Sequence, residues 1–357
     1  MALDTLTLLN DLSDAFGISG FEDSVRERLE PLVRPLVDDV RTDTLGNLIA
    51  TRRGSGPLTL MIDAHMDEVG FMVSYIEPNG FLRFAPIGGW DPRIIPSHSM
   101  TVMTDDGRPV KGVVGVPPPH ITPPADREKP HKMEDLFIDI GADNAAAVAE
   151  MGVRIGSPAV IAYPFESLND NLVCGKALDD RAGCAVLVKT LEALQGEALD
   201  LTVVANFAVA EEVGLRGAQT AAYQIDPDIA LAIEGTIAAD TPGTIPARQP
   251  TGFGKGPAIS VLDNSMIGNP RMVQALTSIA DAEGIRWQYK VPAPGGTNAG
   301  AIQRSRAGVL AGVVSVPCRY IHSPLSLMRL DDFENTVRLV TSFARKGGRQ
   351  LNLPSSK

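Results

Sequence analysis

The chain has 357 residues, enough to bury a large core, and this length suggests about two domains. A hydrophobic fraction of 44% and a charged fraction of 21% are ordinary for a globular protein, and no stretch is apolar for long enough to span a membrane. The formal net charge of −11 argues against a nucleic-acid partner, because binding a phosphate backbone requires a basic face. The N-terminus lacks the basic start and apolar run of a secretory signal, which favours a cytoplasmic protein.

The first part of the sequence predicts helices followed by a buried strand. Apolar residues recur at helical spacing over residues 8–16 and again over 25–36, where two prolines interrupt the pattern. The short apolar run over 58–62 is typical of a buried parallel strand. The sequence Asp-Ala-His-Met-Asp-Glu follows at 63–68, so chemically active side chains stand where this strand ends.

From about Gly70 the pattern changes to short β-like runs separated by turn signals. No long helical pattern occurs before about Asn144, and the Pro-rich stretch Pro117–Pro130 predicts an exposed loop. We therefore expect residues 70–161 to form a β-rich module inserted into a different host domain. The β-like runs are 71–76, 81–84, 100–103 and 110–116.

After the insertion, helix and strand patterns alternate again. Residues 177–194 predict a largely apolar helix, and 201–210 and 229–233 predict buried strands. A closing amphipathic helix is expected around residues 333–340, with Phe333, Val337 and Val340 on its core face. Such alternation predicts an α/β fold with a mostly parallel sheet flanked by helices, formed by residues 1–69 and 162–357.

Polar side chains cluster where the predicted strands end. His65, the pair Glu211-Glu212, and Glu234 each stand at the end of an apolar strand-like run, and the pair Asp179-Asp180 opens a helix. In an open α/β sheet the ligand crevice lies outside the carboxyl ends of the strands. We therefore expect these side chains to meet at one edge of the sheet.

Each of these segments has a simpler explanation when taken alone. An isolated His65-Met66-Asp67 most often contains a buried histidine satisfied by its neighbour, although residues two apart in a strand do point the same way. Asp179-Asp180 taken alone could simply cap the following helix, and His322 is uninformative by itself. It is their combination with two carboxylates at the end of a buried strand that indicates a functional site.

The adjacent carboxylates Glu211 and Glu212 suit a metal hydrolase. Neighbouring side chains diverge, so one can bind a metal ion while the other faces a water molecule. The candidate ligands comprise two histidines and three carboxylates, a set that suits Zn²⁺, Co²⁺ or Mn²⁺. Two ions about 3.5–4 Å apart and sharing one carboxylate would use all five. The candidates are His65, Asp179, Glu212, Glu234 and His322.

Five motifs occur in order along the chain: Ala64-His65-Met66-Asp67-Glu68-Val69-Gly70, Lys176-Ala177-Leu178-Asp179-Asp180-Arg181, Ala210-Glu211-Glu212-Val213-Gly214, Gly295-Gly296-Thr297 and Arg319-Tyr320-Ile321-His322-Ser323-Pro324. Together they resemble the TET aminopeptidases, the glutamyl and leucyl aminopeptidases that use two co-catalytic metals. The resemblance covers almost the whole length, including Ile87-Gly88-Gly89-Trp90 in the insertion.

The resemblance implies a role for each candidate ligand. Asp179 would bridge the two metal ions. His65 and Glu234 would complete the coordination of one ion, and Glu212 and His322 that of the other.

The resemblance also implies the catalytic groups and the assembly. Glu211 would be the general base and acid, and Asp67 would support His65. Residues 70–161 would form the PDZ-like dimerisation domain of the family, and dimers would assemble into a hollow dodecamer. The substrates would be peptides, hydrolysed at the N-terminal bond.

Two residues depart from the family pattern, and three other functions remain open. The family commonly has Asp where Glu234 stands, a position where Glu accompanies carboxypeptidases, and Asp is also more usual than Asn298. The alternatives are a carboxypeptidase or N-deacylase of the same clan, a glycosidase, and an inactive assembly protein. The position of the insertion argues against the first alternative, and the intact ligand set argues against the last. Adjacent glutamates are poorly placed to flank a glycosidic bond.

Overall fold

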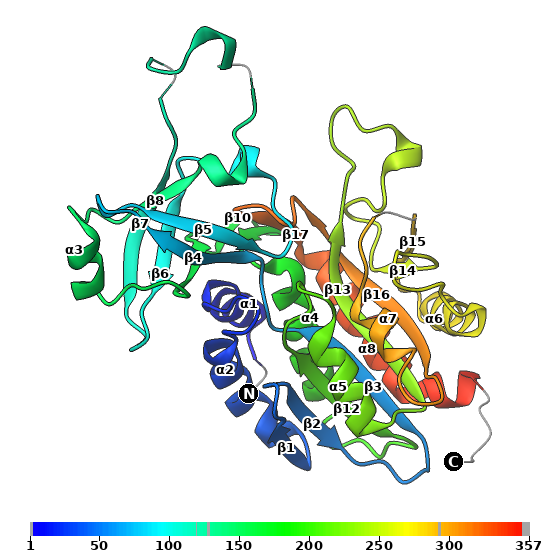
Figure 1. The fold of residues 1–357 in the computed structure, drawn as a ribbon. Helices are drawn as coiled ribbons and strands as arrows, with labels where there is room; N and C mark the ends of the chain where they lie inside the picture. The colour runs from blue at the N-terminus through cyan, green and yellow to red at the C-terminus, as the bar shows by residue number, and fades with distance from the viewer. Residues whose placement is uncertain (1–2, 119, 127–128, 292–293, 352–357) are drawn as a thin grey trace.

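The computed structural model describes residues 3–118, 120–126, 129–291 and 294–351. Figure 1 shows an α/β body with a β-barrel beside it, and the described part of the segment between β7 and β8 projects away from that barrel. Within the described residues, no helix is long and apolar enough to cross a membrane.

The N-terminal segment forms the two predicted helices and the predicted buried strand, and in addition two strands that its periodicity does not predict. Asp4 caps the first helix by accepting a hydrogen bond from the backbone N–H of Thr7 at 2.8 Å. Pro31 lies inside the second helix, which ends two residues later in a 3₁₀ turn, so the interrupted pattern marks an early end. The elements are α1 Thr5–Asp14, α2 Asp23–Val33, η1 Arg34–Leu36, β1 Asp39–Thr42, β2 Leu48–Arg52 and β3 Thr59–His65.

The insertion folds as a closed barrel of six antiparallel strands in the order β4-β5-β8-β7-β6-β9. It has its own apolar core, in which Phe71, Val102 and Ile138 are fully buried. The β-rich character predicted for this part of the chain is therefore confirmed. Its elements are β4 Gly70–Ile76, β5 Leu82–Ile87, η2 Pro92–Ile94, β6 Ser99–Met103, β7 Pro109–Gly115, η3 Pro124–Asp126, η4 Met133–Asp135, β8 Phe137–Asp139, α3 Ala145–Glu150 and β9 Pro158–Ile161.

The remaining chain completes the α/β body. The predicted apolar helix is α4, and the two predicted strands are β12 and β13. The elements are β10 Glu166–Asn169, β11 Leu172–Gly175, α4 Leu178–Ala193, β12 Thr202–Ala208, α5 Arg216–Ile225, β13 Ile229–Ile237, η5 Pro246–Arg248, β14 Ala258–Ser260, α6 Pro270–Ala282, β15 Gln288–Lys290, α7 Asn298–Ile302, β16 Leu310–Arg319, β17 Ser326–Arg329 and α8 Leu330–Leu351.

The large sheet is mixed, which corrects the expectation of a mostly parallel sheet. Its centre is parallel, where the strands run β12-β3-β13-β16, and β14 and β15 form a further parallel pair beside β16. The flanking strands β2, β1, β17, β11 and β10 join antiparallel. Strand pairs such as β1–β2 and β10–β11 are linked by short loops, and a parallel pair would need a long crossover connection.

Helices cover both faces of this sheet. In β3, Leu60 and Ile62 contact the larger core, which also contains apolar residues of α1, α2, α4, α6 and α8, while Met61 contacts a second core shared with α5 and α7. This alternation is the two-residue period of a strand buried on both faces. In α8, Phe333 and Val340 are fully buried in the larger core, as the predicted amphipathic pattern requires. The parallel centre of the sheet is therefore held rigidly, and its carboxyl edge carries the site.

Candidate metal centre

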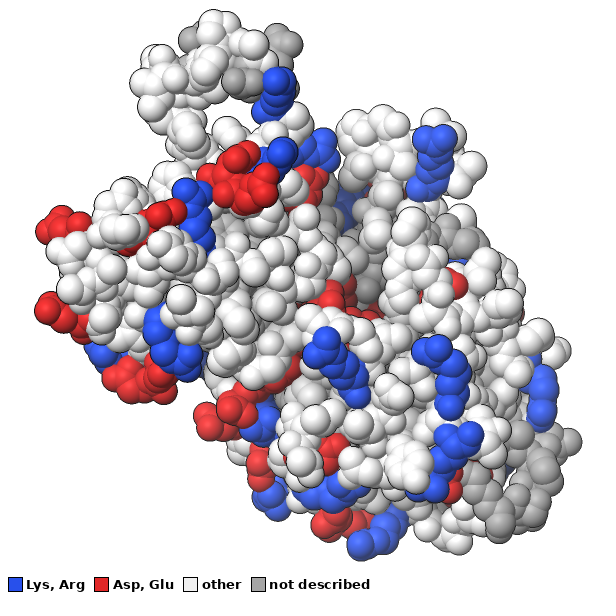
Figure 2. Space-filling view, in the orientation of Figure 1, with Lys and Arg blue, Asp and Glu red and all other residues white. Residues whose placement is uncertain are grey.

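The structure brings the five predicted ligands together at the carboxyl edge of the parallel strands. His65 is the last residue of β3, Glu234 lies in β13, and Glu212 follows β12. Asp179 is in the first turn of α4, and His322 lies between β16 and β17. Figure 2 shows acidic side chains in the hollow between the barrel and the α/β body.

Asp179 stands between the two histidines. Its Oδ1 lies 3.5 Å from His65 Nε2, and its Oδ2 lies 3.6 Å from His322 Nε2. Glu234 Oε2 is 3.8 Å from His65 Nε2, and Glu212 Oε1 is 3.2 Å from His322 Nε2. The side chains thus form two groups of possible ligands that share one aspartate.

These separations fit metal coordination. Two ligand atoms about 2.1 Å from a tetrahedral ion lie roughly 3.4 Å apart. The measured distances between neighbouring candidate ligand atoms are 3.2–3.8 Å. Imidazole and carboxylate donors without thiolate are also the ligands that Zn²⁺, Co²⁺ and Mn²⁺ accept. The residues present therefore fit two adjacent divalent ions.

The electrostatics of the centre favour bound cations. Burial raises the pKa of Glu211 to about 8, and burial together with the charge of Glu211 raises the pKa of Glu234. Burial opposes a charge on His322, but its contacts with Asp179 and Glu212 raise its pKa to about 11. Among the described residues, no lysine or arginine forms an ion pair with these four carboxylates. Divalent ions would supply the missing positive charge.

Glu211 lies beside the metal-ligand groups. It is 9% exposed and shares a cluster of close ligand atoms with His65 and Glu212. Glu211 also lines the pocket that contains the centre. The sequence prediction that the adjacent glutamates could serve different roles is compatible with this position, although the cluster by itself also allows Glu211 to bind an ion.

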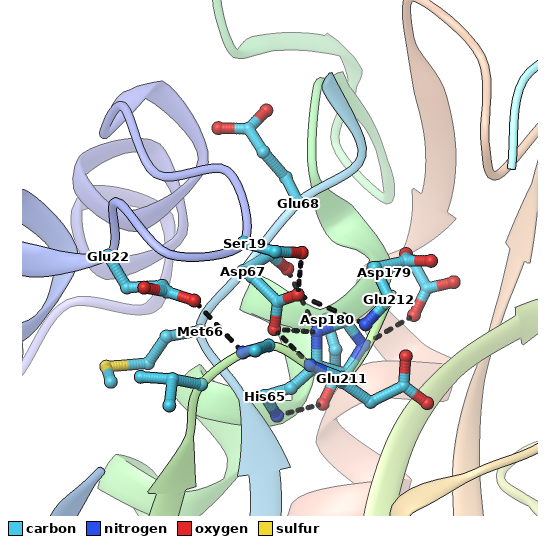
Figure 3. A network of polar contacts seen from close by, with 12 residues as sticks. Ser19, Glu22, His65, Met66, Asp67, Glu68, Asp179, Asp180, Glu211 and Glu212 are labelled. Carbon is cyan, nitrogen blue, oxygen red and sulfur yellow. Dashed lines mark hydrogen bonds and ion pairs between the residues drawn. The ribbon is translucent and has the colours of Figure 1, made fainter. Parts of the chain in front are cut away.

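Asp67 holds the turn that carries Glu211 and Glu212. Its Oδ1 accepts a hydrogen bond from the backbone N–H of Glu211 at 3.0 Å, and its Oδ2 accepts from that of Glu212 at 3.1 Å and from Ser19 Oγ at 2.6 Å (Figure 3). His65 Nδ1 is 2.9 Å from the carbonyl oxygen of Asp67 and 3.4 Å from its carboxylate. Asp67 therefore lies beside His65, as predicted, and in addition fixes the following carboxylate pair.

The inserted barrel also contacts the centre. His322 Nδ1 donates a hydrogen bond to the carbonyl oxygen of Gly89 at 3.1 Å, in the segment that follows β5. This bond leaves Nε2 facing Asp179 and Glu212. The motif around Gly89 was part of the sequence resemblance but was given no role. Every residue has a backbone carbonyl, so the sequence could not indicate that this one binds His322.

A buried polar network behind Glu234 was also missed. Asp63 is fully buried and accepts hydrogen bonds from Asn206 Nδ2 at 2.6 Å and from Asn298 Nδ2 at 2.7 Å. The backbone N–H of Asn298 donates to Glu234 Oε1 at 3.2 Å. Glu234 Oε2 is the oxygen that faces His65. One oxygen of Glu234 is thus held by Asn298, and the other is left for a metal ion.

The motif residues around Asp179 have a structural reason. Arg181 is fully buried and donates to the carbonyl oxygens of Met66 and Leu12, both at 2.6 Å. Lys176 donates to Glu68 Oε1 at 2.6 Å, and Glu68 also pairs with Arg181 at 3.4 Å. These bonds tie the start of α4 to the end of β3, so the segments that carry Asp179 and His65 are fixed relative to each other.

The centre opens into a pocket of about 820 Å³, a size ordinary for a small-molecule or peptide site. Its remaining wall is largely apolar and comes from the ends of β13 and β16 and from the segment before α7. Representative wall residues are Leu215, Ile237, Ala238, Pro294 and Ile321. An α/β sheet with two adjacent groups of candidate histidine and carboxylate ligands in such a pocket fits a two-metal hydrolase, a class that includes metallopeptidases.

Comparison with known proteins places the chain within that class. The family model of the M42 glutamyl aminopeptidases matches residues 46–339, so the chain belongs to this family of metallo-aminopeptidases, which hydrolyse peptide bonds. The lysyl aminopeptidase of Pyrococcus furiosus is 34% identical over 338 residues, which cover 93% of this chain and 94% of that protein.

Solved structures agree with this assignment. A TET aminopeptidase from a Thaumarchaeota archaeon of marine sediment has a TM-score of 0.93 and 38% identity, with 96% of each chain covered. The TET1 peptidase of Pyrococcus horikoshii, which can assemble into a tetrahedron or a large octahedral shell, has a TM-score of 0.85 and 34% identity. That match covers 96% of this chain and 99% of the Pyrococcus chain. The resemblance seen in the sequence motifs is confirmed.

Proposed function

We propose that this protein removes single residues from the N-terminus of peptides, using two divalent metal ions and Glu211 as general base. The observation that carries the proposal is the position of Asp179, whose two carboxylate oxygens face two different imidazoles. A shared carboxylate between two ligand groups is the arrangement that a two-metal hydrolase needs. In this scheme His65 and Glu234 complete one metal site, and Glu212 and His322 complete the other.

The donor set favours zinc, with cobalt or manganese as alternatives. When bound, two such ions would supply Lewis acidity toward the scissile carbonyl and would lower the pKa of the attacking water. The chain's own contribution is to hold the five ligands in place. The network of Glu68, Lys176 and Arg181 fixes the segments that carry Asp179 and His65.

Glu211 carries the proton in the proposed mechanism. Its backbone is anchored by Asp67, so its side chain is held at the pocket surface beside the ligand groups. The Glu211 carboxylate accepts a proton from the attacking water and then gives that proton to the departing amine. Asp67 positions Glu211 and Glu212 and does not itself transfer a proton. Its carboxylate oxygens already accept hydrogen bonds from the backbone N–H groups of Glu211 and Glu212 and from Ser19.

The substrate's free α-amine explains why cleavage is restricted to the N-terminus. The ammonium group of the substrate would be bound by carboxylates of the centre. Membership of an aminopeptidase family favours cleavage at the N-terminus over the activity of a carboxypeptidase or N-deacylase. It also favours a peptidase over a glycosidase. Glu234, where relatives commonly have Asp, is accommodated because Asn298 holds its Oε1.

The inserted barrel is proposed as the dimerisation module, with catalytic residues supplied by 1–69 and 162–357. It contributes none of the five ligands, and its barrel core is separate from the cores of the large sheet. The TET1 relative can assemble into a tetrahedron or a large octahedral shell, and a TET1 structure with 34% identity to this chain contains a dodecamer, so we propose that dimers of this chain assemble into a dodecamer. The contact between Gly89 and His322 also gives the barrel a supporting role at the centre.

Hydrolysis of leucine p-nitroanilide, with and without a chelator, tests the proposed function. The metal-loaded protein should release p-nitroaniline, the chelated protein should not, and added zinc, cobalt or manganese should restore turnover. N-acetyl-leucine p-nitroanilide should remain intact, because it lacks the free amine. Cleavage of the blocked substrate, or of a glucan instead of the peptide analogue, would contradict the proposal.

A further inference from the structure

Side chains from distant segments hold the turn that carries Glu211. Four consecutive backbone N–H groups, those of residues 209–212, each donate a hydrogen bond to a side-chain oxygen at 3.0–3.1 Å. The acceptors are Asn47 for residue 209, Glu22 for residue 210, and Asp67 for residues 211 and 212. Figure 3 shows the bonds that Glu22 and Asp67 make. Asp67 is therefore not the only carboxylate that fixes this turn.

Glu22 reaches the turn from the segment between α1 and α2. It is 5% exposed, and its Oε1 accepts hydrogen bonds from the backbone N–H of Ala210 at 3.0 Å and from that of Gly20 at 2.8 Å. Glu22 directly precedes α2, yet no cap hydrogen bond joins its side chain to that helix, all of which the structure describes. It also lies before residues 46–339, the part of the chain that matches the family model. The Glu22 side chain therefore serves the distant turn and not its own helix.

The backbone at Ala210 needs such support. Its φ angle is 53°, in the left-handed region that residues other than glycine adopt only at an energetic cost. Ala210 is followed at once by Glu211, so a relaxation of this angle would redirect the Glu211 side chain. The bond from the Ala210 N–H to Glu22 opposes that relaxation, because breaking it would leave a buried N–H without an acceptor.

The segment that carries Glu22 also supports Asp67. Ser19 Oγ donates to Asp67 Oδ2 at 2.6 Å, and the carbonyl oxygen of Gly17 accepts from the backbone N–H of Glu68 at 2.9 Å. Burial raises the pKa of Glu22, and the nearby charge of Asp67 raises it further, so a carboxylate is kept here at a cost to stability. A costly buried acceptor of this kind is expected where it fixes a functional group.

We propose that Glu22 is a positioning residue for catalysis: it holds the N–H of Ala210 and thereby keeps the Glu211 carboxylate directed at the water that it deprotonates. This inference rests on the proposed aminopeptidase function and adds a residue to it. Among the described residues, Glu22 belongs neither to the ligand groups nor to the lining of the pocket. Its effect should therefore appear in kcat, with KM and metal content unchanged.

The test measures hydrolysis of leucine p-nitroanilide by zinc-loaded Glu22→Met and Glu22→Gln. Glu22→Met keeps the size of the side chain but removes the acceptor. Its kcat should fall by about tenfold to a hundredfold, since a small misplacement of a catalytic group has effects of this size. Its KM should stay within about twofold of the wild-type value, and its metal content should not change. Glu22→Gln retains an oxygen acceptor, so its kcat should stay within about threefold of the wild-type value.

A matched control and a second readout separate positioning from stability. Asp332→Leu is the control, because Asp332 is also buried and accepts the backbone N–H groups of Gly254 and Gly256, which do not line the pocket. It should lower the melting temperature about as much as Glu22→Met does and leave kcat within about twofold. In the metal-free proteins, amide hydrogens of residues 209–212 should exchange faster in Glu22→Met than in the wild type, the control or Glu22→Gln. If Glu22→Met does not fold, Glu22→Asp replaces it, and its shorter carboxylate should lower kcat by about fivefold.

A double-mutant cycle tests whether Glu22 acts through Glu211. In Glu211→Gln the general base is already lost, so adding Glu22→Met should leave the residual kcat within about twofold. An equal fold loss in both backgrounds, or a wild-type kcat in Glu22→Met, would overturn the role of Glu22. A loss of bound ions in Glu22→Met, or a loss of kcat as large in Glu22→Gln, would overturn it as well. Lack of metal-dependent turnover by the wild type would instead overturn the proposed function itself.

Discussion

The two halves of the proposed metal centre are built in different ways. His65 is 1% exposed and Glu234 is 4% exposed, and both come from central parallel strands. The ring of His65 is oriented by the carbonyl oxygen of Asp67, two residues away in the same segment. By contrast the His322 side chain is 37% exposed, and its ring is oriented by Gly89, 233 residues away in the inserted segment.

This difference separates what the sheet fixes from what the insertion fixes. The buried half depends on strand ends whose positions follow from the packing of the core. The exposed half depends on a loop between β16 and β17, in which Tyr320 and His322 both have positive φ angles. We therefore expect the ion that Asp179 would share with Glu212 and His322 to exchange more readily than the ion that it would share with His65 and Glu234.

The largest effects should come from removing either histidine. His65→Ala and His322→Ala should each stay folded but weaken metal binding by more than about a hundredfold, because each removes a proposed direct ligand. The comparison predicts a difference in stoichiometry: His322→Ala keeps close to one ion per chain after dialysis, whereas His65→Ala also disturbs the buried carboxylates and keeps less. Metal analysis together with circular dichroism checks this prediction. Full occupancy in either variant would break the five-ligand scheme.

A smaller effect should follow from a change in the inserted segment. An added Cβ at Gly89 would lie 3.2 Å from His322 Nδ1, closer than ordinary contact, so Gly89→Val should displace this ring. Metal affinity at the exposed half should fall by about tenfold, and that at the buried half should not change. Titration of the metal-free variant with zinc measures both affinities. Gly89→Ala should have a smaller effect of the same kind. An equal loss of zinc affinity at both halves would contradict the claim that the inserted segment orients only the half containing His322.

The smallest effect concerns the network behind Glu234. Asn298→Ala keeps the backbone N–H that bonds to Glu234 but removes the side chain that ties it to Asp63. We expect about tenfold weaker zinc binding at the buried half. Mutating a residue that orients a metal ligand by hydrogen bonding typically has an effect of this size. Asn298→Asp should be worse than Asn298→Ala, because it places a second carboxylate against the buried Asp63. Zinc affinity that is unchanged in both variants would show that the network does not position Glu234.

Much of the centre could be predicted because chemistry-bearing residues follow apolar runs. His65, Glu211 and Glu234 were found in this way, since the end of a buried strand rarely carries an unpaired charge without a reason. The parallel centre of the sheet and its covering helices followed from the same periodicity.

What could not be predicted depends on contacts between distant segments. The bond from His322 to Gly89 uses a backbone carbonyl, and the bond from Asn298 to Asp63 joins residues 235 positions apart. The antiparallel flanks of the sheet were missed because short apolar runs do not reveal the direction of their partners. The closure of the inserted strands into a barrel depends on strand order, which their β-like patterns leave open.

The role of Glu211 is tested most directly by measuring turnover and metal content in the same preparation of Glu211→Gln. Because this residue is proposed to move a proton and not to bind an ion, the variant should retain two ions per chain. Its kcat for an aminoacyl p-nitroanilide should fall by about 10²- to 10⁴-fold, the usual contribution of a general base. Loss of the ions together with activity would make Glu211 a metal ligand, and a kcat close to that of the wild type would remove it from the mechanism.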